Sequence, residues 1–382
     1  MLKDKNHIYY KDDEMIKEID ISNFKSIKNI KLGNLKRVNF IAGKNGRGKT
    51  SILDAIFITN DLTSPDCLVK PIIFRGGTPN LAAGELWHSY FRNHIKENKI
   101  KILINEYNGA KQETIISIEE KPKGNQNIGL VTSDSLDKNN ISPTSFRGSE
   151  SLKIRKYDKT KNEASSLRID ITQQINGSQI SSNVINHGGS LELKPTTYIT
   201  TSNLINNSNT ILVVGNLIRN KDQAEIIKEM KRINNKITDI QIGIIENTTE
   251  IIFDTGEKKL VSLASMGEGT GKLLTLLAIS YNTKNGIILI DEIENGIHYS
   301  LMPSIIKLLK EQSIKNNNQI FITTHSLDII NTISNLYADK EISDEDISFI
   351  RIGYSETKDE TLTSSFSLPE VKLSSDENWE IR

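Results

Sequence analysis

An octapeptide near the N-terminus has the residue types and spacing that hold nucleotide phosphates. Residues 43–50 are Gly-Lys-Asn-Gly-Arg-Gly-Lys-Thr, which fits the pattern of Gly, any four residues, Gly, Lys, then Ser or Thr. The glycines would let backbone N–H groups turn toward phosphate oxygens, and the N-terminus of a following helix adds partial positive charge. Lys49 would reach the β- and γ-phosphates, and the Thr50 hydroxyl would hold Mg²⁺. The candidate nucleotide-binding residues are Gly43, Lys44, Asn45, Gly46, Arg47, Gly48, Lys49, Thr50 and Ser51.

Two adjacent carboxylates follow a short apolar segment in the C-terminal half. Residues 286–290 predict a buried parallel strand that ends in Asp291 and Glu292. Because side chains alternate along a strand, the two carboxylates should point in different directions. Asp291 can then face Mg²⁺ and Thr50, whereas Glu292 can face the γ-phosphate and polarise the attacking water. A solvated strand end is the alternative, and the phosphate loop upstream favours the catalytic interpretation.

A histidine follows another apolar segment. Residues 320–323 predict a second buried strand, and His325 comes two residues after it. Ligands of open α/β sheets bind at the carboxyl ends of the strands, so His325 can sense the γ-phosphate there. A lone histidine is more often structural, but the neighbouring motifs favour a functional role. The catalytic candidates are therefore Lys49, Glu292 and His325, and the metal-binding candidates are Thr50 and Asp291.

Residues 263–269 are a second candidate for anion binding. They read Leu-Ala-Ser-Met-Gly-Glu-Gly and precede a helix that we expect over 272–281. A Ser-x-Gly at a helix start directs a hydroxyl, backbone N–H groups and the helix dipole toward an anion. Alone, such a segment is usually an ordinary helix cap, but its position ahead of the carboxylate motif favours a functional role. The candidates in it are Ser265, Gly267, Glu268 and Gly269.

The elements that position these motifs predict an α/β fold with a mixed central sheet, an antiparallel subdomain and a polar insertion. A strand over 38–42 and a helix over 49–60 flank the phosphate loop, and Asn108-Gly109 predicts a hairpin. We also expect strands over 17–33, 99–107, 112–119, 196–200, 210–214, 239–246, 249–254 and 346–353, and helices over 85–96 and 221–236.

The polar segment of about 120–189 fits either a mobile insertion or a set of exposed strands. We divide the chain into an N-terminal part of the core (1–107), an antiparallel or insertion subdomain (108–195) and a C-terminal part of the core (196–382).

Composition excludes several classes of protein. The 382 residues include 48 basic and 48 acidic side chains, so there is no global charge signal for nucleic acid or membranes. A single cysteine, Cys67, excludes an intrachain disulfide and suits a reducing compartment. No apolar run is long enough for a membrane span, and the first residues lack the apolar core of a signal peptide. We predict a soluble cytoplasmic protein.

Together the motifs resemble the ATP-binding-cassette ATPases of the SMC and RecF type, and most closely the stand-alone OLD-family ATPases. The resemblance spans roughly residues 16–107 and 196–382 and includes Asn23-Phe24-Lys25-Ser26-Ile27, residues 291–298 and Glu380-Ile381-Arg382. It implies a P-loop NTPase of the ABC/SMC-head type that uses ATP and Mg²⁺. It also implies a head-to-head homodimer, or a higher oligomer, that encloses two ATP molecules.

In each site of such a dimer, Asp291, Glu292 and His325 would come with the phosphate loop from one subunit. Ser265 and Gly267 would come from the other. Met266 and Ala264 stand where transporter cassettes usually have Gly and Leu, which disfavours a transporter.

Three further expectations concern a fused nuclease domain, the glutamine loop and the choice of nucleotide. The residues after His325 are too few for the Toprim nuclease domain of OLD nucleases, so we expect no fused nuclease. The glutamine loop of the superfamily has no clear counterpart, and Asn60 and Asp61 are only candidates. No Asn-Lys-x-Asp guanine signature occurs, so ATP is favoured over GTP.

Three functions fit these observations. The leading hypothesis is an ATP-driven dimerisation switch that controls a separately encoded effector, a role that such relatives often have in bacterial defence against phage. The alternative is a RecF-like DNA-binding ATPase in repair, which leaves nucleic acid as a second type of partner. A transporter motor subunit is the least favoured, and we expect no membrane partner.

Overall fold

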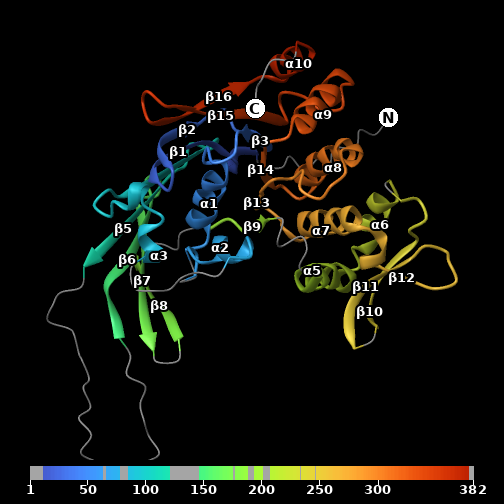
Figure 1. The fold of residues 1–382 in the computed structure, drawn as a ribbon, viewed down its shortest axis with the longest axis horizontal. Coiled ribbons are helices and arrows are strands. Elements are labelled where there is room, and N and C mark those ends of the chain that lie inside the picture. The colour runs from blue at the N-terminus through green and yellow to red at the C-terminus, as the bar shows by residue number, and fades with distance from the viewer. Residues whose placement is uncertain are drawn as a thin grey trace, which may run out of the picture.

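A six-stranded mixed sheet forms the centre of the fold (Figure 1). The computed structural model describes residues 12–62, 66–77, 85–120, 146–174, 177–187, 193–200, 207–232, 234–245 and 247–377. The strands lie in the order β16 (Glu360–Phe366), β15 (Ile347–Ser355), β3 (Val38–Gly43), β14 (Gln319–Thr324), β13 (Ile287–Ile290) and β9 (Thr196–Ile199). All neighbours are parallel except β15 and β16.

The inner strands are apolar on both faces, as buried parallel strands require. Every residue of β3, β13 and β14 is buried. The register pairs Ile322 with Ile290 on one side and with Phe40 on the other. The carboxyl ends of the three strands therefore meet at one edge of the sheet.

Helices cover both faces of this sheet. On one face, α1 (Lys49–Asn60) packs with Ile52 and Ile56 against Leu289 and Phe321. The helices on the other face include α7 (Glu268–Asn282), α8 (Met302–Lys315) and α9 (Leu327–Ala338). Figure 1 shows α1 on one side of β3 and β13 and α7 and α8 on the other. The phosphate loop and the start of α7 are thus attached to opposite faces of one rigid sheet.

A seven-stranded antiparallel sheet lies beside α1. Its order is β2 (Ile27–Leu32), β1 (Ile16–Phe24), β4 (Ile100–Glu106), β5 (Lys111–Glu120), β6 (Phe146–Asp158), β7 (Glu163–Gln174) and β8 (Gly177–His187). The predicted hairpin through Asn108-Gly109 is confirmed. The described part of the polar segment forms strands, whereas 121–145, 175–176 and 188–192 lie outside the described residues. Because β4 pairs with β5, the sheet crosses the predicted boundary between 107 and 108.

A third sheet lies beside α7. It contains β10 (Asp239–Ile245), β11 (Thr248–Asp254) and β12 (Val261–Ser262), next to α5 (Asn207–Asn220) and α6 (Gln223–Lys231). The prediction of a strand over 210–214 is wrong, because these residues belong to α5. Val214 and Leu217 lie three residues apart on one helical face and are both buried, so packing overrides the β-propensity of the segment.

The expected helix over 85–96 is also wrong in part. It is limited to α3 (Glu85–His88) and a 3-10 turn, η2 (Arg92–His94). Asn93 and His94 have φ of 51° and 58°, which a right-handed helix cannot accommodate. Glu380-Ile381-Arg382 lies outside the described residues.

The remaining elements are short. They are α2 (Lys70–Phe74), α10 (Leu368–Asp376), and the 3-10 turns η1 (Asp12–Glu14), η4 (Leu263–Met266) and η5 (Tyr299–Leu301). Among the described helices, none has both the length and the apolar character that crossing a bilayer requires.

Lys156 on β6 is a fully buried cation between the antiparallel sheet and α1. Its Nζ donates a hydrogen bond of 2.9 Å to the carbonyl oxygen of Thr59, near the end of α1. Burial lowers the pKa of Lys156 to about 8, against about 10.4 in an unfolded chain. Between these values the unfolded chain binds more protons at Lys156, so this residue's contribution to the free energy of unfolding rises with pH.

We therefore expect Lys156→Met to lose stability relative to the parent as the pH rises from 8 to 10. The difference in free energy of unfolding between the parent and Lys156→Met should change by about 1 to 3 kcal/mol over this range, since one pKa unit corresponds to about 1.4 kcal/mol. Urea unfolding of both proteins at several pH values measures it, and groups common to both cancel in the difference. A difference that does not vary with pH would contradict the assignment.

Candidate nucleotide-binding site

The phosphate loop joins β3 to α1 in a conformation that depends on glycine. Gly48 has φ of 91° and precedes Lys49, the first residue of α1. A Cβ on Gly43 would lie 2.6 Å from the carbonyl oxygen of Ile352 on β15, so only glycine fits there. The guanidinium of Arg47 lies 4.8 Å from the centre of the Tyr354 ring. The structure thus holds the loop between the start of α1 and β15.

The Lys49 side chain folds back over this loop and is only 5% exposed. Its Nζ donates hydrogen bonds to the carbonyl oxygens of Gly43 at 2.6 Å and Lys44 at 3.1 Å. Burial lowers the pKa of Lys49, and the carboxylates of Glu292, Glu294 and Asp291 oppose that effect. The ammonium group therefore lies inside the loop, where phosphate oxygens would replace carbonyl oxygens as its partners.

Thr50 and Asp291 meet although 241 positions separate them in the chain. Thr50 Oγ1 donates to Asp291 Oδ1 at 3.1 Å, and Thr323 Oγ1 donates to the same oxygen at 2.6 Å. Burial raises the pKa of Asp291, while hydrogen bonds from Thr323 and Thr50 and the charge of Arg75 lower it. A hydroxyl and a carboxylate beside a phosphate loop fit Mg²⁺, which commonly takes one or two carboxylates together with substrate phosphates.

Glu292 turns away from the line of β13. Its φ is 52°, a left-handed conformation that is rare for a residue with a side chain. Its backbone N–H donates to Thr323 Oγ1 at 2.8 Å, and Asn295 Nδ2 donates to Glu292 Oε2 at 2.6 Å. This backbone turn, rather than strand alternation alone, separates the Glu292 carboxylate from that of Asp291.

His325 follows β14 and lies against Glu294. Its backbone N–H donates to Glu294 Oε1 at 2.7 Å, and its Nδ1 is 3.0 Å from the same oxygen. The distance from Nδ1 to Glu292 Oε1 is 3.9 Å. The structure thus brings the histidine next to the candidate base. Glu294 was missed from the sequence, where it is one more acidic residue after a strand.

A buried cluster of charges next to Thr50 and Asp291 was also missed. Asp54 on α1 has no exposed surface, and it accepts hydrogen bonds from Lys25 Nζ at 2.5 Å, from Tyr198 OH at 3.0 Å and from Arg75. Arg75 Nε lies 3.6 Å from Asp291 Oδ2. Burial opposes the charge of Arg75, but Asp54 and Tyr198 raise its pKa above the usual value. A carboxylate four residues after Thr50, in the otherwise apolar segment 52–58 of α1, was the available signal.

The Ser-x-Gly segment is exposed at the start of α7. Ser265 lies in η4, and Gly267, with φ of 86°, is the N-cap of the helix. Gly269 follows in the first turn, and the side chain of Glu268 lies outside the described part of the chain. One turn further along, Lys272 Nζ donates to the carbonyl oxygen of Asn295 at 2.8 Å, which links α7 to the loop that carries Glu292.

Asn60 and Asp61, the candidates for the glutamine loop, lie at the far end of α1. Asn60 Nδ2 donates back to the carbonyl oxygen of Ile56 at 2.9 Å, and Asp61 Oδ2 is 2.7 Å from Lys70 Nζ. Because a helix rises 1.5 Å per residue, both lie about 15 Å along α1 from Thr50. This places them far from the phosphate loop.

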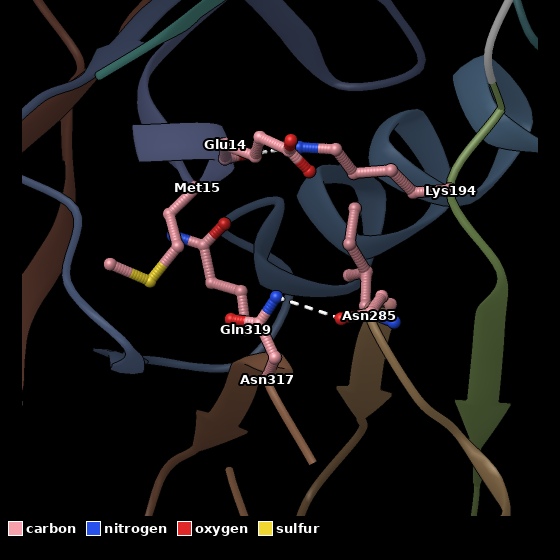
Figure 2. Close-up of a pocket in the computed structure, with 8 residues that line it drawn as sticks. Glu14, Met15, Lys194, Asn285, Asn317 and Gln319 are labelled. Atoms are coloured by element: carbon pink, nitrogen blue, oxygen red, sulfur yellow. Dashed lines mark hydrogen bonds between the residues drawn. The ribbon is translucent and has the colours of Figure 1, made fainter. Parts of the chain in front are cut away.

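Among the residues that the structure describes, the opposite edge of the central sheet offers no comparable site. Figure 2 shows a cavity there, between Glu14, Lys194 and the residues that begin β13 and β14. Its volume is about 20 Å³, which is room for a single water molecule. Gln319 fills this region by exchanging two hydrogen bonds of 2.8 Å with the backbone of Ile16. This edge is therefore a structural seam between the two larger sheets.

The central sheet, the phosphate loop and the acidic pair at the carboxyl ends of its parallel strands define a P-loop nucleotide-binding protein. The family model described as "AAA domain, putative AbiEii toxin, Type IV TA system" matches residues 38–331, which include β3, α7, Asp291 and His325. The chain belongs to this AAA-type ATPase family.

The chain is also similar to individual proteins. An ATP/GTP phosphatase of Helicobacter pylori is 23% identical over 350 residues, which are 86% of this chain and 90% of that protein. The DNA replication and repair protein RecF of Cytophaga hutchinsonii is 27% identical over 117 residues, which are 30% of this chain and 28% of RecF. The SMC head domain from Thermotoga maritima aligns with a TM-score of 0.44 at 13% identity, covering 92% of this chain and 99% of that one. The narrower OLD-family resemblance stays a prediction.

Proposed function

We propose that this protein binds and hydrolyses ATP with Mg²⁺ and acts as an ATP-driven dimerisation switch. The observation that carries the proposal is the contact of 3.1 Å between Thr50 and Asp291, beside the Lys49 ammonium group. This contact connects the start of α1 to the end of β13. It places two oxygen ligands for a cation there, and the phosphates of a bound nucleotide would coordinate the same cation. A cavity of about 480 Å³, lined by Lys25, Ser26 and Tyr90 among others, supports the proposal, because Ser26 also borders Gly48.

Different residues have different roles in the proposed hydrolysis. Lys49 and the backbone N–H groups of the loop hold the phosphates, and bound Mg²⁺ would neutralise their charge. Glu292 orients a water whose oxygen forms a bond to the γ-phosphorus as the bond to the β,γ-bridging oxygen breaks. The proton of the water passes to Glu292, and ADP leaves with the bridging oxygen. Asn295 holds the carboxylate of Glu292 in place for this step.

The dimer in this proposal is supported by the exposure of Ser265 and Gly267 at the start of α7. Their helix packs on the face of the sheet opposite to α1, so an ATP on a second subunit is their natural ligand. Closure by ATP and opening by hydrolysis would give two states for a separately encoded effector to distinguish. The toxin and the Type IV TA system in the family description support such a two-component role, and we propose cytoplasmic defence against phage.

The test is the solution mass of Glu292→Gln with and without ATP and Mg²⁺, measured by light scattering. We expect the mass to double with ATP, because the site binds nucleotide but cannot complete hydrolysis. Phosphate release should fall about 100-fold or more, the usual contribution of a positioned base. Glu345→Gln is the control, because Glu345 is exposed in the loop before β15, at the other edge of the sheet. Hydrolysis by Glu292→Gln at the parent rate, or an unchanged mass with ATP bound, would refute the proposal.

A RecF-like role on DNA is the second candidate, and the 117-residue match to RecF favours it. It predicts that ATP tightens binding to duplex DNA and that affinity falls steeply with salt. Fluorescence anisotropy at several salt concentrations measures both effects. If the protein does not bind DNA at low salt, this candidate is excluded.

A further inference from the structure

The small sheet beside α7 has an edge strand, β10, whose outer side is unpaired. β10 pairs with β11 on one side, and no other described strand lies on its outer side. The edge of the central sheet at β16 differs, because Thr363 Oγ1 there donates a hydrogen bond of 2.8 Å to the carbonyl oxygen of Lys31 on β2. An unpaired edge strand presents backbone N–H and C=O groups to which another chain can add a strand. β10 therefore offers such groups for pairing.

β10 also lacks the residues that usually protect an edge strand from pairing. Residues 239–245 read Asp-Ile-Gln-Ile-Gly-Ile-Ile, with no Lys, Arg or Pro and with a single charge at the first position. Ile244 is 78% exposed, although it lies on a strand. Leu212 of α5 is 66% exposed, one turn before Gly215, where an added Cβ would lie 3.3 Å from Ile242 Cδ1. Exposed apolar side chains thus accompany the unpaired backbone of β10.

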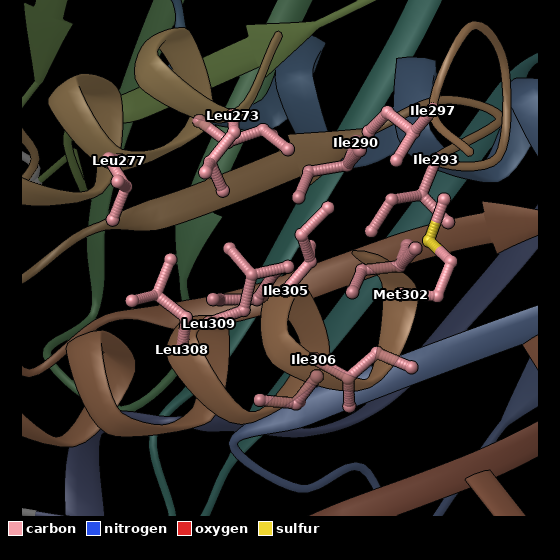
Figure 3. Close-up of a cluster of buried hydrophobic side chains, with 14 of the residues drawn as sticks. Leu273, Leu277, Ile290, Ile293, Ile297, Met302, Ile305, Ile306, Leu308 and Leu309 are labelled. Atoms are coloured by element: carbon pink, nitrogen blue, oxygen red, sulfur yellow. The ribbon is translucent and has the colours of Figure 1, made fainter. Parts of the chain in front are cut away.

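The inner face of β10 is fixed in the apolar core. Ile240 is buried with Ile251 and Phe253 of β11, in the cluster that also contains Leu273 and Leu277 of α7. Figure 3 shows these two leucines in another part of the same cluster. Because the core already holds β10 in place, little conformational entropy would be lost when a further strand pairs with it.

The sequence of β10 is complementary to itself in the antiparallel direction. If Ile242 lies opposite Ile242 of a second copy, Ile240 of each copy lies opposite Ile244 of the other. Gln241 then lies opposite Gly243, and no two like charges face each other across the strands. Apolar pairs across an antiparallel ladder are stabilising, and a contact of one patch with itself closes with two-fold symmetry. This sequence therefore favours a second copy of the chain as the partner of β10.

We propose that β10 pairs antiparallel with β10 of a second copy, so that two of the small sheets join into one. This dimer forms without nucleotide and goes beyond the proposed ATP-driven dimer. β12 leads into η4 and Ser265, and it lies two strands away from β10, at a distance of about 10 Å. Pairing through β10 therefore leaves the start of α7 free for the ATP-dependent contact.

The test is the solution mass of the parent and of Ile244→Lys without nucleotide, measured by sedimentation velocity over a series of concentrations. Pairing at one edge buries less than the roughly 1,200 Å² of a stable interface, so we expect a dissociation constant on the order of 10 μM. The mass of the parent should approach twice that of the monomer at about ten times this concentration. Ile244→Lys should weaken the association at least about 10-fold, because each ammonium group would lie opposite Ile240 of the other copy.

Leu373→Lys is the matched control, because Leu373 is 50% exposed on α10, which Figure 1 shows at the other end of the molecule from β10. It should associate like the parent. Hydrogen exchange tests the type of contact, since amide exchange in 240–244 should slow when the parent dimerises. The inference is overturned if the parent keeps the mass of a monomer, which would leave this edge to a strand of a different protein. It is also overturned if Ile244→Lys keeps the mass of the parent, or if exchange in 240–244 does not change on dimerisation.

A double variant separates this inference from the proposed function. Ile244→Lys should release phosphate at the parent rate, and Glu292→Gln combined with Ile244→Lys should still double in mass with ATP and Mg²⁺. If the double variant does not respond to ATP while the parent dimerises without nucleotide, only the proposed function fails. If the double variant responds to ATP while the parent without nucleotide is a monomer, only the pairing of β10 fails.

Discussion

Lys49→Ala should bind ATP at least about 100-fold more weakly than the parent and should lose hydrolysis with it. The ammonium group of Lys49 lies inside the phosphate loop. It donates hydrogen bonds there to the carbonyl oxygens of Gly43 and Lys44. Hydrogen bonds to charged groups contribute about 1.5 to 3 kcal/mol each, and every 1.4 kcal/mol changes affinity tenfold.

Equilibrium titration with a fluorescent ATP analogue, together with a phosphate-release assay, measures this loss. Lys258→Ala is the matched control, because Lys258 is an exposed lysine between β11 and β12. It should keep the affinity and the rate of the parent. If Lys49→Ala binds ATP with the affinity of the parent, the nucleotide does not bind at residues 43–50.

Asp54→Ala should lower the free energy of unfolding by about 3 to 5 kcal/mol, the usual cost of removing one partner from a buried ion pair. The carboxylate of Asp54 has no exposed surface and accepts hydrogen bonds from Lys25, Arg75 and Tyr198. Without Asp54, the nearest carboxylate described for the Arg75 guanidinium would be that of Asp291, whose Oδ2 lies 3.6 Å from Arg75 Nε. The charge of Arg75 would then be compensated less well.

Chemical denaturation at neutral pH measures this change. Asp376→Ala is the comparison, because Asp376 pairs with Lys372 at 3.1 Å on the exposed side of α10. Exposed pairs of this kind contribute less than about 1 kcal/mol. Equal losses in the two variants would show that the buried cluster does not stabilise the core.

The sequence by itself was enough to predict the class of fold and the local motifs. Glycine spacing at 43–50 and an apolar segment before Asp291 are local signals, because strands and helices have fixed periods and tight turns need glycine. The same signals predicted the meeting of Thr50 and Asp291, since the carboxyl ends of parallel strands share one edge of a sheet.

Secondary structure was less predictable where packing outweighs propensity. Residues 210–214 are rich in β-branched and apolar side chains, yet they form part of α5 because that helix packs against α7. The polar segment after Glu120 left two alternatives open, and pairing with β5 decides in favour of strands for its described part.

Only the tertiary structure shows which side chains support the predicted site. Arg75 reaches Asp54 and Asp291, Glu294 holds His325, and Lys272 reaches Asn295. Each of these contacts joins different elements, and no periodic pattern records which charged residue of one element will meet which residue of another. Such pairing depends on how sheets and helices pack, because a buried charge persists only where the folded chain brings it a partner.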